Sequence, residues 1–251
     1  MPQTIYDWYR LSRSGTRGAF LKALSALSPT LLAQMARGES ALPPTSRTRK
    51  REELDALART SLPSLAMLRA SEPNEQTLQW LFLHRGYLAI PKQTVLLREL
   101  PNCHFDQPVA GRADLFAFDR QLQQPILIEL KRAKALDPLT AAVLEILFHW
   151  VFHTRYRDDL EELIGSYGFA CSTPPQLVIA APHLYFNEAK RRSSRRHGEY
   201  ERALIWIEEL CQRQIVEIDL LAIDNDWLQI GPGFPISQLL GASRSEECDG
   251  N

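Results

Sequence analysis

Apolar residues recur at helical spacing in the first part of the chain. The runs 20–27 and 31–35 each place apolar residues on one helix face, and Ser28-Pro29 between them predicts a break. Residues 38–50 contain two adjacent prolines with Ser and Thr, a composition typical of a linker. The pattern therefore predicts an N-terminal helical extension with a linker over residues 1–70.

From Ser71 the pattern changes to helices that alternate with short apolar strands. A helix is predicted from about Ser71 to Gly86. Further strands are predicted at 94–100, 113–118, 126–130, 177–180 and 215–223, and further helices at 137–154 and 199–212. This order predicts an α/β domain over residues 71–230, with one mixed sheet flanked by helices. Residues 231–251 are predicted to form a tail.

Composition narrows the function classes only slightly. The 251 residues are 45% hydrophobic and 24% charged, as in ordinary globular proteins. Because the formal net charge is -1, contact with nucleic acid has to rest on local basic clusters. The four cysteines include no C-x-x-C pair, which argues against a structural zinc site. No apolar run approaches the roughly 20 residues that cross a bilayer, and no signal peptide is evident, so we predict a cytoplasmic protein with no membrane partner.

Two carboxylates and a lysine stand at the ends of adjacent predicted strands. In the strand that ends Glu129-Leu130-Lys131, the acid and the base project to the same side. A buried carboxylate there is costly unless it is paired or metal-bound. Asp114 opens the preceding strand, and a hairpin through the turn at 121–125 would bring it to Glu129. Convergent carboxylates suit Mg²⁺, and a neighbouring lysine can orient or deprotonate an attacking water.

This arrangement resembles the PD-(D/E)XK, or restriction-endonuclease-like, nuclease superfamily. Gly111-Arg112-Ala113-Asp114, a turn and an apolar strand that ends in Glu-x-Lys are similar to its signature, although Ala113 stands where the motif has proline. The resemblance covers roughly residues 71–225. It implies a restriction-endonuclease-like fold and hydrolysis of phosphodiester bonds with Mg²⁺ or Mn²⁺, in DNA rather than RNA. It also implies a role in defence or repair, without choosing between them.

The resemblance implies a role for each matching residue. Asp114 and Glu129 would bind the metal ion together with the main-chain carbonyl of Leu130. Lys131 would position the nucleophilic water. Glu75 would hold a second metal or a metal-bound water, although the helix dipole also favours a glutamate in a first turn. A homodimer is compatible with the resemblance, because many relatives use two sites to cut two strands.

Two further groups of residues have both a functional and a structural interpretation. Glu145, His149 and His153 share one helix face, either facing the active centre, or holding a separate cation, or forming the polar rim of an ordinary helix. The basic run over 190–197 fits contact with phosphates, or is a solvated face. The predicted nucleic-acid contacts are Arg112, Lys190, Arg191, Arg192, Arg195 and Arg196.

The aromatic residues also divide into two groups. Tyr185 and Phe186 lie just before the basic run and are candidates for stacking on bases. Trp80, Trp150 and Trp206 lie within apolar helical patterns and are predicted to belong to the core.

Two other functions remain open from the sequence. A non-catalytic nucleic-acid-binding module could keep the same fold, but the intact Asp114, Glu129 and Lys131 argue against it. A regulatory or protein-interaction domain would use residues 1–70 as its working part.

Overall fold

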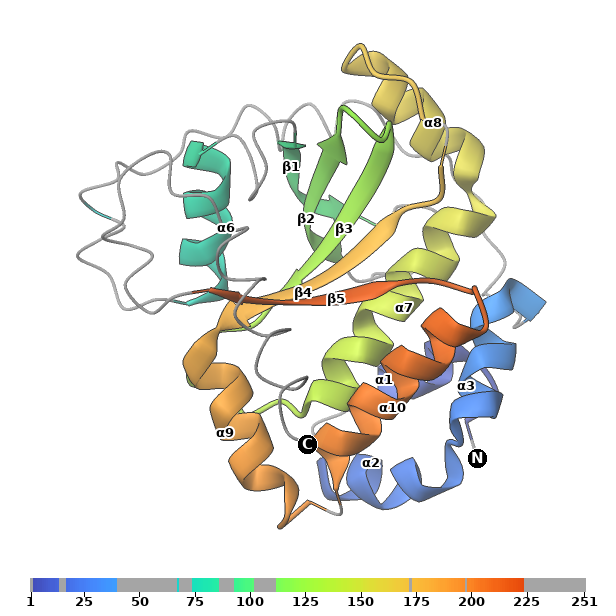
Figure 1. Cartoon of the computed structure of the whole chain (residues 1–251), viewed down its shortest axis with the longest axis vertical. Helices are drawn as coiled ribbons and strands as arrows, with labels where there is room; N and C mark the ends of the chain where they lie inside the picture. The colour runs from blue at the N-terminus through green and yellow to red at the C-terminus, as the bar shows by residue number, and fades with distance from the viewer. Residues whose placement is uncertain are drawn as a thin grey trace, which may run out of the picture.

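The molecule consists of one mixed sheet with helices on both faces (Figure 1). The computed structural model describes residues 2–13, 17–39, 67, 74–85, 93–101, 112–171, 173–196 and 198–223. Its strands are β1 (Gln93–Pro101), β2 (Arg112–Asp119), β3 (Gln124–Leu130), β4 (Gln176–Pro182) and β5 (Ile218–Ile223). Their order in the sheet follows their order in the chain. The first three strands are antiparallel, and β3, β4 and β5 are parallel, which confirms the predicted α/β class with a mixed sheet.

The helices form two layers around this sheet. The described helices are α1 (Ile5–Arg13), α2 (Arg17–Ala23), α3 (Pro29–Gln34), α6 (Glu75–Arg85), α7 (Leu139–Arg155), α8 (Arg157–Ser166), α9 (His183–Ser193) and α10 (Glu199–Gln212), with a 3-10 turn η1 (Leu24–Ala26) and a π-helical turn η2 (Met35–Glu39). Helix α6 covers one face, while α7, α10 and the N-terminal helices cover the other (Figure 1). None of the described helices combines the length and apolarity needed to cross a lipid bilayer.

Most elements begin and end close to the positions that the sequence predicts. The predicted break at Ser28 is confirmed, because its hydroxyl accepts a hydrogen bond from the Leu31 N–H and caps α3. Strand β5 begins three residues later than predicted, at Ile218. The reason is the end of α10, where the Ile215 N–H donates to the Leu210 carbonyl at 3.0 Å and keeps the chain in a helix cap. Helices α8 and α9 were not predicted.

Several predictions fall outside the described residues. These are most of the linker at 38–50, the domain boundaries near 70 and 230, and the tail at 231–251.

Side-chain alternation along β3 separates the two hydrophobic cores. Leu127 packs with α7 and α10, whereas Ile126, Ile128 and Leu130 pack with α6. Glu129 shares the face of Leu127 and therefore points toward α7.

The N-terminal helices share the core on the α7 side of the sheet. Helix α7 is buried on all sides from Leu139 to His153. Trp8 of α1 is 1% exposed, and Tyr9 stacks on Phe148 of α7 with ring centroids 4.6 Å apart. The sequence predicts helices here but not this shared core, because helical spacing does not identify the surface on which a helix packs.

Replacement of Trp8 tests whether α1 is part of this core. We expect Trp8→Ala to lower the free energy of unfolding by about 3–5 kcal/mol, because it leaves a cavity between α1 and its neighbours. Urea unfolding measures the change, with Lys22→Ala on the exposed side of α2 as the control. Equal stability of Trp8→Ala and the wild type would show that α1 does not belong to the core.

Candidate active site and metal centre

The β2–β3 hairpin brings Asp114 to Glu129, as the sequence predicts. The ladder between the strands ends at Leu115 and Ile128, one residue before these two carboxylates. At that point Asp114 Oδ2 accepts a hydrogen bond from the Leu130 N–H at 2.7 Å. On the other side, the Lys131 N–H donates to the Ala180 carbonyl at 2.9 Å, which fixes the end of β3 against β4. The carbonyl of Leu130 is a predicted metal ligand, and the hydrogen bond from the Leu130 N–H to Asp114 fixes the backbone at this residue.

Lys131 lies between two buried glutamates. Its Nζ donates to Glu129 Oε1 on the same strand and to Glu145 Oε2 on α7, the latter at 3.1 Å. Glu129 is 2% and Lys131 3% exposed. The predicted common orientation of Glu129 and Lys131 is therefore confirmed. Of the three interpretations of Glu145, a position facing the predicted site is the one that its contact with Lys131 supports.

The first helix of the chain also contributes to the site. Arg13, at the end of α1, donates from Nη1 to Glu145 Oε1 at 3.1 Å. Its side chain is 61% exposed, whereas that of Glu145 is 10% exposed. Glu145 is therefore held by Lys131 from inside and by Arg13 from the surface. Burial, reinforced by the charge of Glu145, raises the pKa of Tyr9 on the same helix to about 12, so its hydroxyl stays protonated.

The three carboxyl groups differ in their affinity for protons. Burial raises the pKa of Asp114 to about 7, although Lys131 and the Leu130 N–H oppose the change. Burial, followed by the charges of Asp114 and Glu145, raises the pKa of Glu129 well above its usual range. Burial also opposes ionisation of Glu145, but Lys131 and Arg13 outweigh it and lower this pKa to about 2. Glu145 is thus the firmly ionised acid of the three.

The two bases of the site, Lys131 and His149, differ in their protonation. Burial alone would lower the pKa of Lys131, but Glu129 and Glu145 outweigh it and raise this pKa well above the ordinary value. Burial lowers the pKa of His149 to about 4, even though Glu145 opposes the change. Near neutral pH the lysine is therefore charged and the imidazole is neutral, which is the form that ligates metals.

The donor set fits a divalent cation. One ligand atom from each of Glu129, Glu145 and His149 lies within 4.8 Å of the others. Glu129 Oε2 is buried and has no hydrogen-bond partner among the described residues. A buried carboxylate oxygen without a partner is costly, and a bound cation would satisfy it. The three residues could hold a metal ion.

Helix α6 approaches the same carboxylates from the other face of the sheet. Glu75, in its first turn, is partly buried, and its charge makes a minor contribution to the raised pKa values of Asp114 and Lys131. Gln79, one turn later, donates from Nε2 to Asp114 Oδ1 at 3.2 Å and is 5% exposed. Glu75 thus lies near Asp114 as predicted, while its role stays a prediction.

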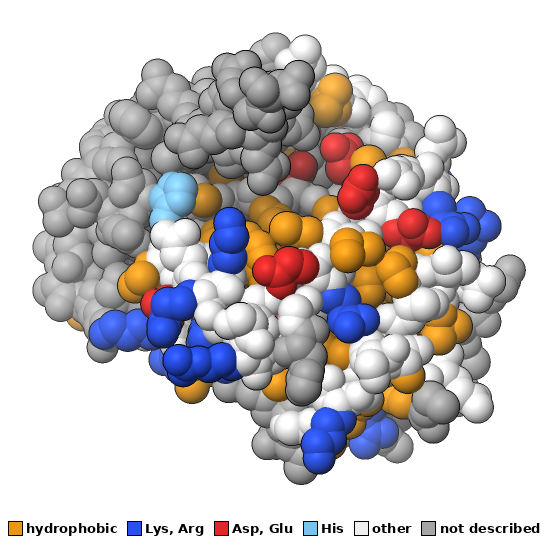
Figure 2. Space-filling model, turned by 60° about the horizontal axis from the view of Figure 1, so that its bottom comes forward, with side chains coloured by type: hydrophobic (Ala, Val, Ile, Leu, Met, Phe, Trp, Pro, Cys, Tyr) orange, Lys and Arg blue, Asp and Glu red, His pale blue; other side chains and the backbone are white. Residues whose placement is uncertain are grey.

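The basic run forms part of α9 and the turn after it. Lys190, Arg191 and Arg195 are exposed, and Arg191 pairs with Glu188 at 2.7 Å. Figure 2 shows Lys and Arg side chains gathered at the left of the lower end of the molecule, the side on which α9 lies in Figure 1. Arg112 is exposed at the start of β2. Nucleic-acid contact by these residues stays a prediction.

Two arginines of the run anchor the loop that follows Lys131. Arg192 donates from Nη2 to the Ala135 carbonyl at 3.0 Å, and Arg196 donates from Nη1 to the Leu136 carbonyl, also at 3.0 Å. They therefore hold the connection from β3 to α7.

The prediction that Tyr185 stacks on bases is wrong. Its side chain is fully buried, and its hydroxyl donates to the Asp137 carbonyl at 3.3 Å. A position next to a basic run does not indicate which side of α9 faces the core. Trp150 and Trp206 are buried as predicted, and Trp80 is partly buried against the α6 core.

Sequence reasoning missed Arg13 and Gln79. Gln79 follows Glu75 at i+4 and so shares its helix face, a signal that could have identified it. No sequence signal places Arg13, because it reaches Glu145 across 132 positions.

No family model, curated protein or solved structure matches the chain.

The raised pKa of Asp114 predicts a pH-dependent stability in the absence of metal. A carboxyl whose pKa rises from 3.8 to about 7 on folding stabilises the protein fully below pH 3.8, and this contribution is lost as the pH rises through 7. The variant Asp114→Asn has no carboxyl group to ionise at this position, so it lacks this pH dependence. We expect its free energy of unfolding, relative to the wild type, to increase by about 1–3 kcal/mol between pH 5 and pH 8.

Urea unfolding in EDTA at both pH values measures this difference. The partial exposure of Asp114 sets the lower end of the range, since solvent screens part of the effect. If the free energies of unfolding of Asp114→Asn and the wild type differ by the same amount at both pH values, the pKa of Asp114 is not raised.

Proposed function

We propose that the chain is a metal-dependent nuclease of the PD-(D/E)XK type, which hydrolyses phosphodiester bonds in DNA. The observation that carries the proposal is the cluster of Asp114, Glu129 and Lys131 at the end of β3, with Glu145 facing it from α7. An antiparallel hairpin followed by parallel strands, with helices on both faces, is compatible with a restriction-endonuclease-like fold. Contact with DNA would involve Arg112 and the basic run on α9.

The proposed cofactor is Mg²⁺ or Mn²⁺. Glu129 and Glu145 offer oxygen ligands, which suit both ions, and His149 adds a nitrogen ligand that suits Mn²⁺ better than Mg²⁺. Asp114 is not part of this group of three and stays a predicted further ligand. A cation held by these residues would polarise the scissile phosphate and offset the negative charge of the transition state.

In this proposal Lys131 acts through its protonated ammonium group, which its two glutamate partners hold in place. Glu129 and Glu145 raise its pKa, which favours the protonated form, so we do not assign it the removal of a proton from water. Its ammonium group can donate a hydrogen bond to the attacking water or to a phosphate oxygen. Of the two roles open to the lysine, orienting the water is therefore the one we propose.

Arg13 positions the substrate in this proposal. Its guanidinium contacts Glu145, yet most of its side chain is exposed to solvent, so it lies at the entrance of the cluster. A guanidinium fits phosphate oxygens through two parallel hydrogen bonds. We assign it to a phosphate next to the bond that is cleaved.

Removal of the charged groups at the end of β3 should abolish cleavage. We expect Glu129→Gln and Lys131→Ala each to lower the rate of DNA cleavage at least about 100-fold, because each removes a group that stabilises the transition state. The assay uses plasmid and linear single-stranded DNA with Mg²⁺, with Mn²⁺ and with EDTA. Glu161→Gln on α8, outside the site, is the matched control.

Thermal unfolding separates loss of chemistry from loss of folding in these variants. Folded variants that cleave as fast as the wild type would refute the proposal. A wild type that binds DNA without cleaving it under any metal condition would instead support the non-catalytic binding module.

Arg13 can be compared with Arg10 on the same helix, which lies over the Tyr6 ring at 5.8 Å and forms no ion pair with the described carboxylates of the cluster. We expect Arg13→Ala to weaken DNA binding about five- to tenfold through the lost phosphate contact. The same variant should bind Mn²⁺ about severalfold more tightly, because it frees Glu145 from a competing cation. Arg10→Ala should change neither. Fluorescence anisotropy with labelled DNA and calorimetry with Mn²⁺ measure the two affinities.

If Arg13→Ala and Arg10→Ala weaken DNA binding equally, the effect is one of total charge, and Arg13 makes no specific contact with a phosphate. Unchanged Mn²⁺ affinity in Arg13→Ala would show that Glu145 does not take part in metal binding.

A further inference from the structure

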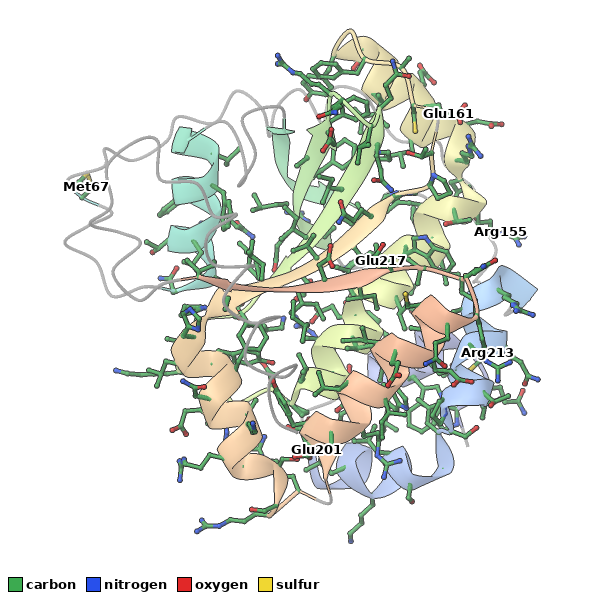
Figure 3. All side chains as sticks on the ribbon, viewed as in Figure 1. Met67, Arg155, Glu161, Glu201, Arg213 and Glu217 are labelled. Atoms are coloured by element: carbon green, nitrogen blue, oxygen red, sulfur yellow. The ribbon has the colours of Figure 1, made fainter. Side chains whose placement is uncertain are left out.

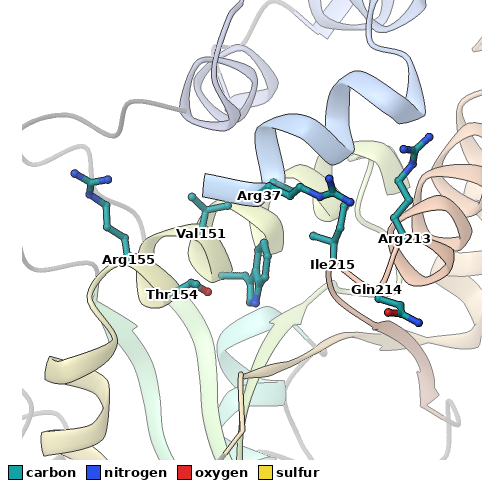
Figure 4. A pocket seen from close by; sticks show the side chains of 9 residues that line it. Arg37, Val151, Thr154, Arg155, Arg213, Gln214 and Ile215 are labelled. Atoms are coloured by element: carbon teal, nitrogen blue, oxygen red, sulfur yellow. The ribbon is translucent and has the colours of Figure 1, made fainter. Parts of the chain in front are cut away.

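A pocket of about 400 Å³ lies between the C-terminal ends of α7 and α10 and the turn η2 (Figure 4). It is lined by Ala36, Arg37, Trp150, Val151, Thr154, Arg155, Arg213, Gln214 and Ile215. None of these residues belongs to the candidate active site, and its volume is in the range of small-molecule sites.

The described lining of this pocket carries three positive charges and no negative one. In Figure 4 the side chains of Arg37 and Arg213 lie toward one end of the pocket, and Arg155 lies toward the other. Figure 3 places Arg155 and Arg213 at the same edge of the molecule. Arg213 shares its charge with Glu209 at 2.5 Å, whereas neither Arg37 nor Arg155 forms an ion pair with another described residue. The pocket therefore favours an anion.

One wall of the pocket is apolar. Trp150 and Val151 are 6% and 3% exposed, and Ile215 is partly buried. Thr154 adds a hydroxyl group at the edge of this wall. Three arginines beside an apolar wall suit a ligand that combines an anionic group with an apolar or ring-shaped part.

Gln214 has an unusual backbone conformation for its residue type. Its φ of 53° is left-handed, at the cap that ends α10, where glycine is the usual residue. A side chain there costs about 1–2 kcal/mol of strain, and backbone strain often marks functional sites. Gln214 is one of the residues that line the pocket, and a glycine there would remove its side chain.

We propose that this pocket binds a nucleotide. Its phosphates contact the guanidinium groups of Arg37 and Arg213 at one end of the pocket, and its base lies against the wall of Trp150 and Ile215. Arg155, at the other end, donates to an acceptor atom of the base. Phosphate is the favoured anion because several guanidinium groups can offset its two negative charges and match its oxygens. The site is independent of the proposed nuclease activity, and its test does not require cleavage.

The test is calorimetric titration of the full chain in EDTA with ADP, with inorganic phosphate and with adenosine. We expect ADP to bind more tightly than either of its parts. Arg37→Gln and Arg155→Gln should each weaken ADP binding about tenfold or more, since each removes a charge-assisted hydrogen bond. Arg157→Gln, two residues beyond Arg155 and outside the pocket, is the matched control. Glu129→Gln should bind ADP like the wild type, because it alters only the metal centre.

Each outcome decides the proposal. Absence of ADP binding, or equal weakening in Arg155→Gln and Arg157→Gln, would refute it. Phosphate that binds as tightly as ADP would reduce the site to a simple anion site. Adenosine that binds as tightly as ADP would remove the role of Arg37 and Arg213. Weaker ADP binding in Glu129→Gln would place the ligand at the metal centre instead.

Discussion

Burial of ionised groups between β3 and α7 is the constraint on which the site depends. Each buried ion costs several kcal/mol, and Lys131 offsets this cost for both Glu129 and Glu145. Asp114 adds a third carboxyl, so with Arg13 the cluster holds three acids and two bases. Apolar replacements of such clusters are often neutral or stabilising, so stability alone does not account for it. A cation that neutralises the remaining acid would account for both the excess carboxyl and the buried Glu129 oxygen without a partner among the described residues.

The fold provides the rigidity that such a cluster requires. Strand β3 is paired on both sides, and its end is fixed by the bond from Lys131 to Ala180. Helix α7 is enclosed between the sheet and the N-terminal helices, so Glu145 and His149 have little freedom to move away. Arg192 and Arg196 hold the connection between these two elements. The site is thus assembled from elements whose own packing determines its geometry.

The parts of the site that follow from local periodicity could be predicted from the sequence. Alternation along a strand places Glu129 and Lys131 on one side, and a hairpin of the predicted length brings Asp114 beside them. Helical spacing places Glu145 and His149 on one face, but only tertiary packing shows that this face meets β3. Arg13 could not be predicted, because its contact depends on how α1 packs. The wrong prediction for Tyr185 has the same origin, since α9 has both a buried and an exposed face.

Helix α7 carries residues of both proposed sites, and this limits which substitutions can distinguish them. Glu145 and Thr154 are nine residues apart, a rise of about 13 Å along the helix. A cavity in the buried part of α7, for instance at Phe148, would disturb both ends, because a close-packed interior transmits strain. Arg13 and Arg155 instead carry exposed side chains. Arg13 contacts α7 from another helix, and Arg155 is the last residue of α7. Substitutions at these two arginines therefore separate a local loss of charge from a change in the helix that both sites share.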